Sequence, residues 1–347
     1  MINLNIDKVN LSNFNEIQEI KEFLAHFDLQ YDSNIDFSVV AREGQRIIAT
    51  ASKEKNVVKC FAINSNYQGE GLSTQLLTTL INKMFDEGYY HSLVFTKLLN
   101  KELFKGMGYK EVAHTDKVIL MEIGNKSIDK TLKQIIQKYK IDTSKKRAMI
   151  VMNCNPFTLG HQYLIEKVAS ENEEVLIFVV EEDKSIFPFK IRYELVRKGT
   201  AHLSNVKVLE GTEYIISSAT FPSYFLRKED DTLIEYTKLD ASICGESFGK
   251  ALNIDRRYVG EEPYCKVTNA YNSTLMDILP KYGIEVIVIP RKENDGKAIS
   301  ASYVRELLKE DNFEKIKNLV PKSTFDFLTS PQGKEIGEKL KISNAPH

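Results

Sequence analysis

Residues 148–170 of the chain read AMIVMNCNPFTLGHQYLIEKVAS, and this stretch decides the fold of the second half. An apolar run is followed by a polar turn that contains Pro156, and a Gly160–His161 pair then begins an amphipathic segment. An uninterrupted apolar run is typical of a strand buried on both faces, and the segment after it has helical spacing. The sequence therefore predicts a strand, a turn and a helix, with His161 where the helix begins.

Similar apolar runs recur through the second half of the chain, with helical patterns between them. We expect strands at 148–152, 175–180, 205–209, 241–245 and 284–289. Strand–helix alternation predicts a Rossmann-like, doubly wound parallel sheet, and such sheets bind ligands at the carboxyl ends of their strands. The turn after residue 152 lies at such an end, so we expect it to hold a ligand.

The first half has a different pattern, in which short strand-like runs surround helical segments. We expect these strands at 37–42, 46–52, 57–63, 91–96 and 117–123. Residues 73–89 carry apolar side chains at helical spacing, and a lysine-rich, weakly amphipathic stretch follows the last strand. Both halves are therefore α/β. We divide the chain into a first domain at 1–125, a helical connector at 126–146, a second domain at 147–325 and a C-terminal tail at 326–347.

The composition excludes several classes of protein. A chain of 347 residues favours two domains, and 42% hydrophobic with 27% charged residues suits a globular protein with a sizeable core. The formal net charge of −1 argues against nucleic-acid binding over the whole surface but leaves room for a local basic patch. No apolar run approaches the roughly 20 residues that span a bilayer, and the N-terminus has no signal-peptide pattern. Cys60, Cys154, Cys244 and Cys265 form no CxxC pair, so we expect no zinc site, no disulfide framework and a cytoplasmic protein.

The turn before His161 has the chemistry of an anion site. N–H groups at the amino end of a helix are unpaired and carry partial positive charge, which favours phosphate. Gly160 has no Cβ and lets the backbone approach a ligand closely. His161 can donate a hydrogen bond to a phosphate oxygen and so offset the charge that develops in a displacement at phosphorus. The alternative is that Pro156 and Gly160 only shape the turn and that His161 only caps the helix.

A second candidate anion site lies at 296–310, with the sequence GKAISASYVRELLKE. Ser300 and Ser302 lie before or within the first turn of an amphipathic helix, and Arg305 lies one turn further on. The hydroxyls can cap the helix or donate to a phosphate, and a guanidinium pairs well with phosphate. The alternative is a capping pattern beside a solvated arginine.

Together the two stretches resemble the signature of the nucleotidyltransferase superfamily. That signature has a T/H-x-G-H motif after the first strand, matched by 158–161, and an I-S-x-S/T-x-x-R motif that opens a late helix, matched by 299–305. The resemblance implies that both motifs bind the triphosphate of ATP or CTP while a nucleophile attacks the α-phosphorus and releases pyrophosphate. It also implies that Lys184 and Arg192, after the second strand, reach the phosphates or the acceptor. The alternative for Lys184 is a surface lysine among acidic neighbours.

Arg291 follows the last predicted strand, at another carboxyl end, and either contacts the nucleotide or lies at the surface. The residues that we expect to contact ATP are Asn155, Phe157, Thr158, Gly160, His161, Arg192, Arg291, Ser300, Ser302 and Arg305.

One family within the superfamily resembles this sequence over more of the chain than these two motifs. The stretches MNCNPFTLGHQYLIE, ATFPSYFL, VGEEPYCKVTNAYN and IPRKENDGKAISASYVREL resemble the C-terminal domain of citrate lyase ligases, whose N-terminal domain is acetyltransferase-like. The resemblance implies an AMP-forming acid–thiol ligase. Acetate would attack ATP to give acetyl-adenylate and pyrophosphate. The thiol of the prosthetic group on the acyl carrier subunit of citrate lyase would then take the acetyl group, which turns the lyase on.

The residues fit such a reaction. A carboxylate is already a nucleophile at neutral pH, so it needs no general base, and positioning with charge neutralisation can supply the catalysis. We expect His161, Lys184, Ser302 and Arg305 to act in this way, with Mg²⁺ accompanying ATP. No cluster in the sequence names protein ligands of Mg²⁺, which often binds mainly through substrate phosphates and water.

The first half resembles GCN5-related N-acetyltransferases in one loop. Residues 68–73, QGEGLS, are similar to the Q/R-x-x-G-x-G/A loop that binds the pyrophosphate of coenzyme A, with Ser73 in place of the last Gly or Ala. The alternative is a plain strand–turn–helix junction. In LFKGMGYKEV, Phe104 replaces the tyrosine that often acts as general acid, which argues against acetyl transfer to an amine. Our hypothesis is that the domain binds the carrier, or its phosphopantetheine-like arm through Gln68, Gly69 and Gly71.

Two other functions stay open. The same chemistry could adenylylate a phosphorylated small molecule, or the chain could be a non-enzymatic acyl-coenzyme A sensor with a relic nucleotide domain. Nucleotide turnover separates the sensor from both enzymes, and dependence on the acceptor separates the two enzymes.

Overall fold

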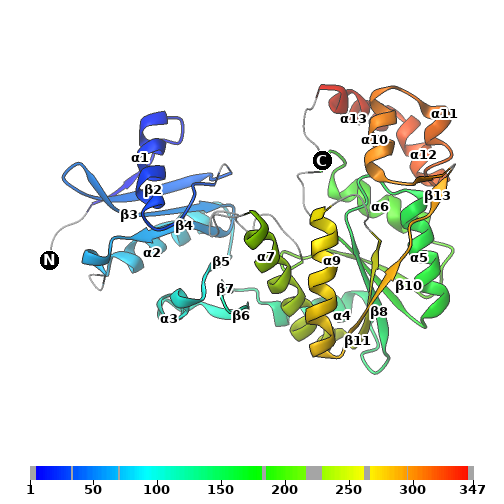
Figure 1. Ribbon diagram of the computed structural model, residues 1–347. Coiled ribbons are helices and arrows are strands. Elements are labelled where there is room, and N and C mark those ends of the chain that lie inside the picture. Colours follow the sequence, from blue (N-terminus) through cyan, green and yellow to red (C-terminus); the bar gives the residue numbers. More distant parts are fainter. Residues whose placement is uncertain are drawn as a thin grey trace. The chain divides into compact units, whose positions relative to one another are not determined.

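The structure is a computed structural model that describes residues 5–32, 34–68, 71–181, 185–215, 229–261, 266–294 and 296–342. The chain forms two compact units, and Figure 1 colours both along the sequence. The first comprises residues 1–131 and 218–243, and the second comprises 132–217 and 244–347. The first unit therefore takes a segment from the second half of the chain, which the sequence analysis did not anticipate.

The first unit is built on a seven-stranded sheet in the order β1-β2-β3-β4-β5-β7-β6. Its strands are β1 (Ile6–Lys8), β2 (Phe37–Glu43), β3 (Arg46–Glu54), β4 (Val57–Ile63), β5 (His91–Lys97), β6 (Lys110–His114) and β7 (Val118–Gly124). Neighbouring strands are antiparallel except β4 and β5, which run parallel. These two strands pair only at Val57 with Leu93 and at Val58 with Val94, and among the described residues no ladder joins them beyond that point.

Helix α2 (Leu72–Asp86) covers one face of this sheet with apolar residues at helical spacing. Helix α7 (Glu229–Ile243) packs on β6 and β7, although it follows β10 of the second unit in the chain. The ring of Tyr236 in α7 lies 5.7 Å from that of Phe95 in β5, and Glu235 accepts a hydrogen bond from Thr115 Oγ1 at 2.7 Å. The other helices of this part of the chain are α1 (Phe14–Ala25), α3 (Lys101–Gly106) and α4 (Ile128–Tyr139), which leads into the second unit.

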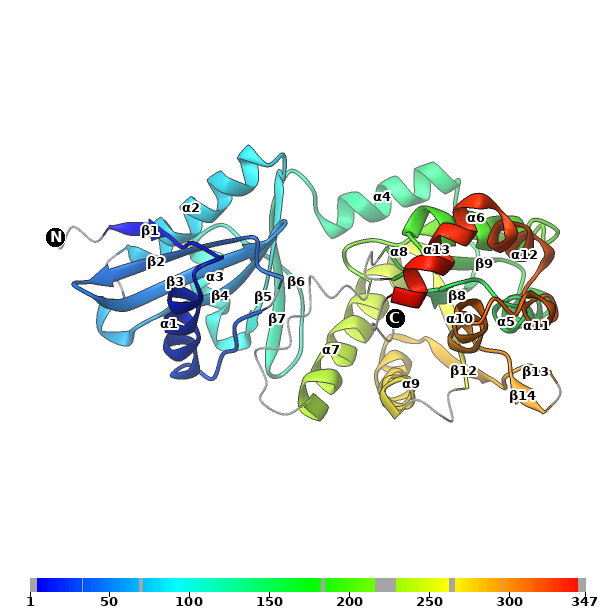
Figure 2. The same ribbon diagram turned by 90° about the horizontal axis from the view of Figure 1, so that it is seen from above.

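The second unit has a five-stranded, all-parallel sheet in the order β10-β9-β8-β11-β12. Its strands are β8 (Arg147–Met152), β9 (Val175–Val179), β10 (Val206–Glu210), β11 (Ile254–Gly260) and β12 (Glu285–Ile289). From β8 the chain passes to β9 and β10 on one side and later to β11 and β12 on the other side, so the strand order reverses beside β8. Figure 2 labels β8, β9 and β12 of this sheet. This is the predicted doubly wound sheet, and ligands bind at such a reversal.

Helices lie on both faces of this sheet, which explains why β8 and β9 are almost entirely apolar. Helices α5 (Leu159–Glu171) and α6 (Phe189–Gly199) pack against alternate residues of β8 and β9 on one face. Helix α9 (Lys266–Ile278) links β11 to β12. On the face opposite α5, the ring of Phe178 in β9 meets that of Phe248 at a centroid distance of 5.6 Å.

The strand predicted at 241–245 is wrong. These residues end α7 and begin a π-helical turn at Cys244–Gly249, before the short α8 (Lys250–Leu252). They are apolar because they pack on the sheet, where Cys244 Sγ lies 3.7 Å from Met149 Sδ. The missing strand is β11, whose apolar pattern is interrupted by two successive arginines.

A helical cluster follows the sheet. The short hairpin β13 (Glu293–Asn294) and β14 (Lys297–Ala298) leads to α10 (Ala301–Lys309), α11 (Phe313–Ile316), α12 (Lys322–Thr329) and α13 (Pro331–Ile342). These helices share one apolar core that includes Val304, Leu307 and Leu340. Most of the predicted tail is therefore helix packed against α10, the helix that carries the second motif.

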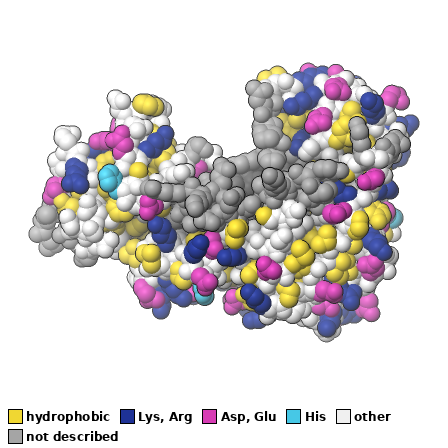
Figure 3. Space-filling view, in the orientation of Figure 1, with side chains coloured by type: hydrophobic (Ala, Val, Ile, Leu, Met, Phe, Trp, Pro, Cys, Tyr) yellow, Lys and Arg dark blue, Asp and Glu magenta, His cyan; other side chains and the backbone are white. Residues whose placement is uncertain are grey.

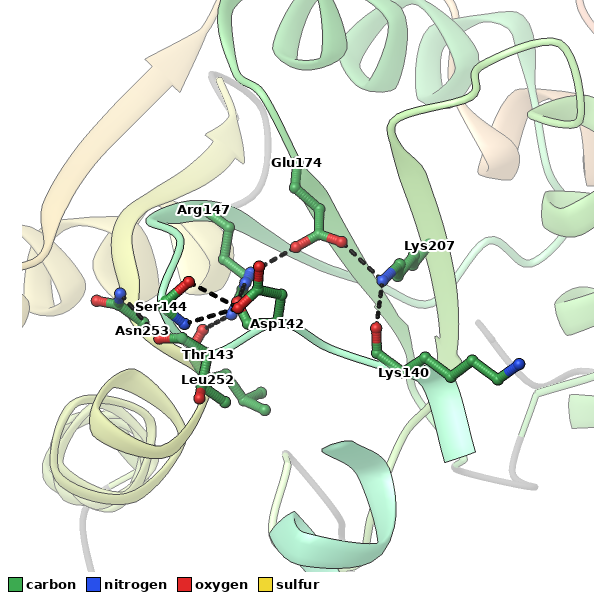
Figure 4. Close-up of polar contacts among 9 residues, drawn as sticks. All are labelled: Lys140, Asp142, Thr143, Ser144, Arg147, Glu174, Lys207, Leu252 and Asn253. Carbon is green, nitrogen blue, oxygen red and sulfur yellow. Dashed lines mark hydrogen bonds and ion pairs between the residues drawn. The ribbon is translucent and has the colours of Figure 1, made fainter. Parts of the chain in front are cut away.

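The amino end of β8 is fixed by a buried arginine, Arg147, which is 2% exposed (Figure 4). Its Nε donates to Glu174 Oε2 at 2.8 Å, and its two Nη atoms donate to the carbonyls of Leu252 and Asp142. Glu174 also pairs with Lys207 at 2.7 Å. This cluster lies at the end of the sheet opposite the turn that follows β8.

The surface carries mixed charges. On the face shown in Figure 3, Lys and Arg side chains are interspersed with Asp and Glu over both units. Over the described part of the chain, no helix is both long and apolar enough to cross a bilayer.

Candidate active site

The turn after β8 leads into helix α5, as the sequence predicts, and the start of this helix is capped. Thr158 is the N-cap of α5, and its Oγ1 accepts a hydrogen bond from the backbone N–H of His161 at 3.4 Å. In return, the backbone N–H of Thr158 donates to Nδ1 of His161 at 3.0 Å. Because Nδ1 accepts this bond, the proton of the neutral imidazole is on Nε2. The cap thus leaves Nε2–H as a hydrogen-bond donor for a ligand.

The surroundings of His161 keep its imidazole neutral. Burial lowers the pKa of His161 to about 4, and the positive charge of Arg291 acts in the same direction. Phe157, which is fully buried, stacks on the imidazole with the ring centroids 5.9 Å apart and the planes 14° apart. Phe157 therefore supports His161 from within the protein, and its predicted contact with ATP stays a prediction.

The two sequence motifs meet at Gly160. A Cβ added to Gly160 would lie 2.8 Å from the carbonyl oxygen of Ile299, the first residue of the second motif. The backbone N–H of Leu159 also donates to the carbonyl of Leu319 at 2.9 Å. The amino end of α5 therefore lies directly against the segment that enters α10, and it needs a glycine there because a side chain would strike backbone.

The second motif presents hydroxyls and a guanidinium on one turn of helix. Ser300 caps α10 by accepting from the backbone N–H of Tyr303 at 3.1 Å. Ser302 is exposed, and Arg305 Nη2 donates to its Oγ at 3.3 Å. Arg305 Nη1 donates to the backbone carbonyl of Asn155 in the turn after β8 at 2.6 Å, and burial lowers the pKa of Arg305. The guanidinium therefore joins α10 to the first motif.

Arg192 lies inside the protein, with no exposed surface. Its Nη1 lies 2.7 to 2.8 Å from three acceptors, the carbonyl and Oδ1 of Asn153 and the carbonyl of Val180, and its Nε donates to the carbonyl of Phe187 at 2.9 Å. These bonds make Arg192 a brace between the carboxyl ends of β8 and β9. Its predicted contact with the nucleotide has no support from this geometry and stays a prediction.

Two other predicted site residues are Arg291 and Lys184. Arg291 follows β12, and its Nε donates to the carbonyl of Glu261, after β11, at 2.8 Å. Lys184 falls outside the described residues. Sequence reasoning missed Asn153, an exposed amide next to the strand end whose Nδ2 donates to Ser185 Oγ at 3.1 Å. A polar residue directly after a buried strand is the signal that could have found it.

The structure offers no protein cage for a metal ion in the part that it describes. No three His, Cys, Asp or Glu side chains there come close enough together to hold one. The described residues thus do not fit a dedicated Mg²⁺ site built from three such side chains.

The loop that resembles a coenzyme A loop lies in the first unit. Gly71 is the N-cap of α2 with φ of +78°, a left-handed conformation that favours glycine, while Gly69 falls outside the described residues. Gln68 ends the short helix that precedes this loop. Phe104 is 1% exposed, and its ring contacts those of Phe61 and Tyr109, so no phenol occupies the position of the general acid.

Comparison with known proteins agrees with this arrangement. The family model for the C-terminal domain of citrate lyase ligase matches residues 147–328, and that of the acetyltransferase (GNAT) family matches residues 6–109. The chain belongs to the citrate lyase ligase family.

Relatives from two bacteria cover nearly the whole chain. The citrate (pro-3S)-lyase ligase of Klebsiella pneumoniae is 36% identical over 316 residues, 90% of this chain and 92% of the relative. That of Escherichia coli is 34% identical over 326 residues, 92% of each. A phosphopantetheine adenylyltransferase of Corynebacterium efficiens is 42% identical over 57 residues, 16% of this chain and 36% of that protein. Family membership makes the chain a ligase and confirms the resemblance found in the sequence.

Proposed function

We propose that this ligase activates citrate lyase by acetylating the thiol of the prosthetic group on its acyl carrier subunit. A carboxylate oxygen of acetate attacks the α-phosphorus of ATP. The bond between the α-phosphorus and the oxygen that bridges it to the β-phosphorus breaks. The products are acetyl-adenylate and pyrophosphate. The thiol sulfur then attacks the acetyl carbon, the thiol proton is lost to solvent, and AMP leaves.

One observation carries the proposal: the contact of Gly160 with Ile299, with the bond from Arg305 to Asn155, puts both phosphate motifs beside one strand end. A triphosphate there would accept a hydrogen bond from His161 Nε2 and meet the charge of Arg305, while Ser300 and Ser302 line the other side. These groups offset the charge that moves to pyrophosphate, and acetate needs no base because it is ionised at neutral pH. We keep Lys184 as a further proposed phosphate ligand and Mg²⁺ as the proposed companion of ATP.

The test is ATP–pyrophosphate exchange with the purified chain and Mg²⁺, with and without acetate. Exchange that requires acetate supports carboxylate adenylation. His161→Ala removes one donor to developing charge, which we expect to lower exchange by about 10²–10³-fold. If the exchange rate does not depend on acetate or on any other small carboxylate, carboxylate adenylation is ruled out.

A second candidate has one observation in its favour, the short similarity to phosphopantetheine adenylyltransferases. In that case the acceptor is a phosphorylated small molecule, and ATP turnover would follow added 4′-phosphopantetheine instead of acetate. The same set of assays therefore separates the two.

For the first unit, we propose that it binds the thiol arm of the carrier. The left-handed Gly71 precedes α2, where unpaired N–H groups favour a phosphate. In the same sheet β4 pairs with β5 only at its start, so the end of β4, which leads toward this loop, is not paired with β5. Gly71→Val strains this loop, so we expect the apparent KM for the carrier to rise about tenfold while acetate-dependent exchange stays unchanged. An unchanged KM for the carrier would mean that the arm binds elsewhere.

A further inference from the structure

Arg192 is linked to Arg305 by hydrogen bonds that pass through two intermediate residues, Phe187 and Asn155. Arg192 Nε donates to the carbonyl of Phe187 at 2.9 Å, and the backbone N–H of the same Phe187 donates to Asn155 Oδ1 at 3.2 Å. The carbonyl of Asn155 then accepts from Arg305 Nη1 at 2.6 Å. A continuous path of hydrogen bonds thus runs from α6 through two loops to α10.

The path is buried along most of its length. Arg192 and Phe187 have no exposed surface, and Asn155 is 4% exposed. Buried hydrogen bonds to a charged group are strong, and each lost bond leaves a polar group without its partner. Arg192 also holds Asn153 by its carbonyl and its side chain, so its guanidinium fixes the start of the turn after β8.

We propose that Arg192 is a positioning residue that sets Arg305 for the triphosphate by fixing the carbonyl of Asn155. Only a planar, forked group holds Asn153, Val180 and Phe187 at once, because Nε and Nη1 point to different segments. A lysine keeps the charge but has a single nitrogen, so it cannot bridge them. This inference rests on the proposed function only in taking ATP as the ligand.

The chain offers a matched control in Arg147. Both arginines are buried, both donate to backbone carbonyls of other segments, and both brace β8, but Arg147 does so at the amino end (Figure 4). Arg147→Lys therefore reports what the loss of a buried fork does to the fold alone.

The experiment is calorimetric titration of the full chain with ATP and Mg²⁺ in a double-mutant cycle. We expect Arg192→Lys to weaken ATP binding about tenfold and Arg147→Lys to change it less than about twofold. In an Arg305→Ala background, Arg192→Lys should lose most of its effect, because the residue through which it acts is gone. Asn155→Ala interrupts the same path without touching Arg192 and should show the same dependence on Arg305.

Three results would overturn the inference: equal effects of Arg192→Lys with and without Arg305, an equal effect of Arg147→Lys, or a wild-type chain that binds no ATP. If Arg192→Lys fails to fold, the Asn155→Ala pair decides. Coupled ATP binding without acetate-dependent exchange would instead leave Arg192 in its role and refute only the adenylation of acetate.

Discussion

At His161 the fold decides which nitrogen carries the proton. The Thr158 cap occupies Nδ1, and burial with Arg291 disfavours the imidazolium. A histidine whose pKa is lowered in the folded state stabilises the fold fully above its unfolded pKa of about 6.5, and this contribution is lost as the pH falls toward the folded value of about 4. A donor that stays neutral needs no protonation step before it binds phosphate.

We therefore predict that His161 does not titrate near pH 6.5. Imidazole ¹⁵N–¹H spectra, assigned by difference from His161→Asn, should show the Nε2-protonated tautomer at neutral pH and a pKa near 4. ATP should raise this pKa, because phosphate charge favours the imidazolium. A free-protein titration near the ordinary value, or an Nδ1-protonated tautomer, would contradict the geometry of the cap.

Gly160 is the residue on which the contact between the two motifs depends. The methyl group of Gly160→Ala would meet the carbonyl of Ile299 at 2.8 Å, so α5 and the start of α10 must move apart. We predict a loss of about 1–3 kcal/mol of stability and at least tenfold weaker ATP binding. Gly337→Ala in α13, where an added Cβ meets nothing within 4 Å, is the control in thermal unfolding and titration. Normal ATP binding by Gly160→Ala would refute this account.

At the scale of single elements, the sequence was most informative where local rules decide the structure. Ser300 is the N-cap of α10, as the sequence allowed, because a serine before an amphipathic segment is recognisable as a capping residue from the sequence alone. It was least informative where distant backbone groups decide. The partners of Arg192 are carbonyls from three other segments, which no sequence pattern encodes. The fixed role of a buried arginine therefore appears only once the strands are in place.

Strand β11 is an element that the sequence analysis did not predict. It lies between β8 and β12, yet it contains Arg256 and Arg257. Arg256 faces the α5 side, where its Nη1 donates to Asn172 Oδ1 at 3.1 Å. Arg257 points to the other face and is 3% exposed, and its Nε and Nη1 have no hydrogen-bond partner within the described structure. A rule that expects apolar runs in buried strands misses such a strand, and it favours residues 241–245, which end α7 and begin the π-helical turn.

A buried guanidinium with unpaired N–H groups costs stability. We predict that Arg257→Met, which keeps a long flexible side chain without the charge, raises the free energy of unfolding by about 1–3 kcal/mol. The same change at Arg147 should lower it by about 3–5 kcal/mol, because it breaks the buried ion pair with Glu174 and leaves the carbonyls of Leu252 and Asp142 without this donor. Denaturant unfolding of the two variants measures both, and a loss of stability in Arg257→Met would show that its nitrogens are satisfied.

At the scale of the whole molecule, the two units are interlaced in sequence. Helix α7 enters between β10 and β11 of the second unit but packs on β6 and β7 of the first. Its buried Glu235 accepts a hydrogen bond from the hydroxyl of Thr115, and the ring of Tyr236 packs against that of Phe95. A reading by composition and periodicity places the border after β7, since nothing in the sequence of α7 says which sheet it covers. The first unit therefore depends on a helix translated about a hundred residues after its last strand.

This interlacing predicts how the chain responds to cutting. Residues 1–146 alone lack α7, so the face around Phe95 meets water, and residues 147–347 alone carry α7 without its sheet. We expect each half to be poorly folded when expressed alone and the two halves to associate when co-expressed, because α7 restores the missing contacts. Co-purification of tagged halves tests this, with Glu235→Lys as the variant that should weaken association, since it replaces the 2% exposed acceptor of Thr115 with a buried cation. A half 1–146 that is monomeric and unfolds cooperatively without its partner would show that α7 is dispensable to the first unit.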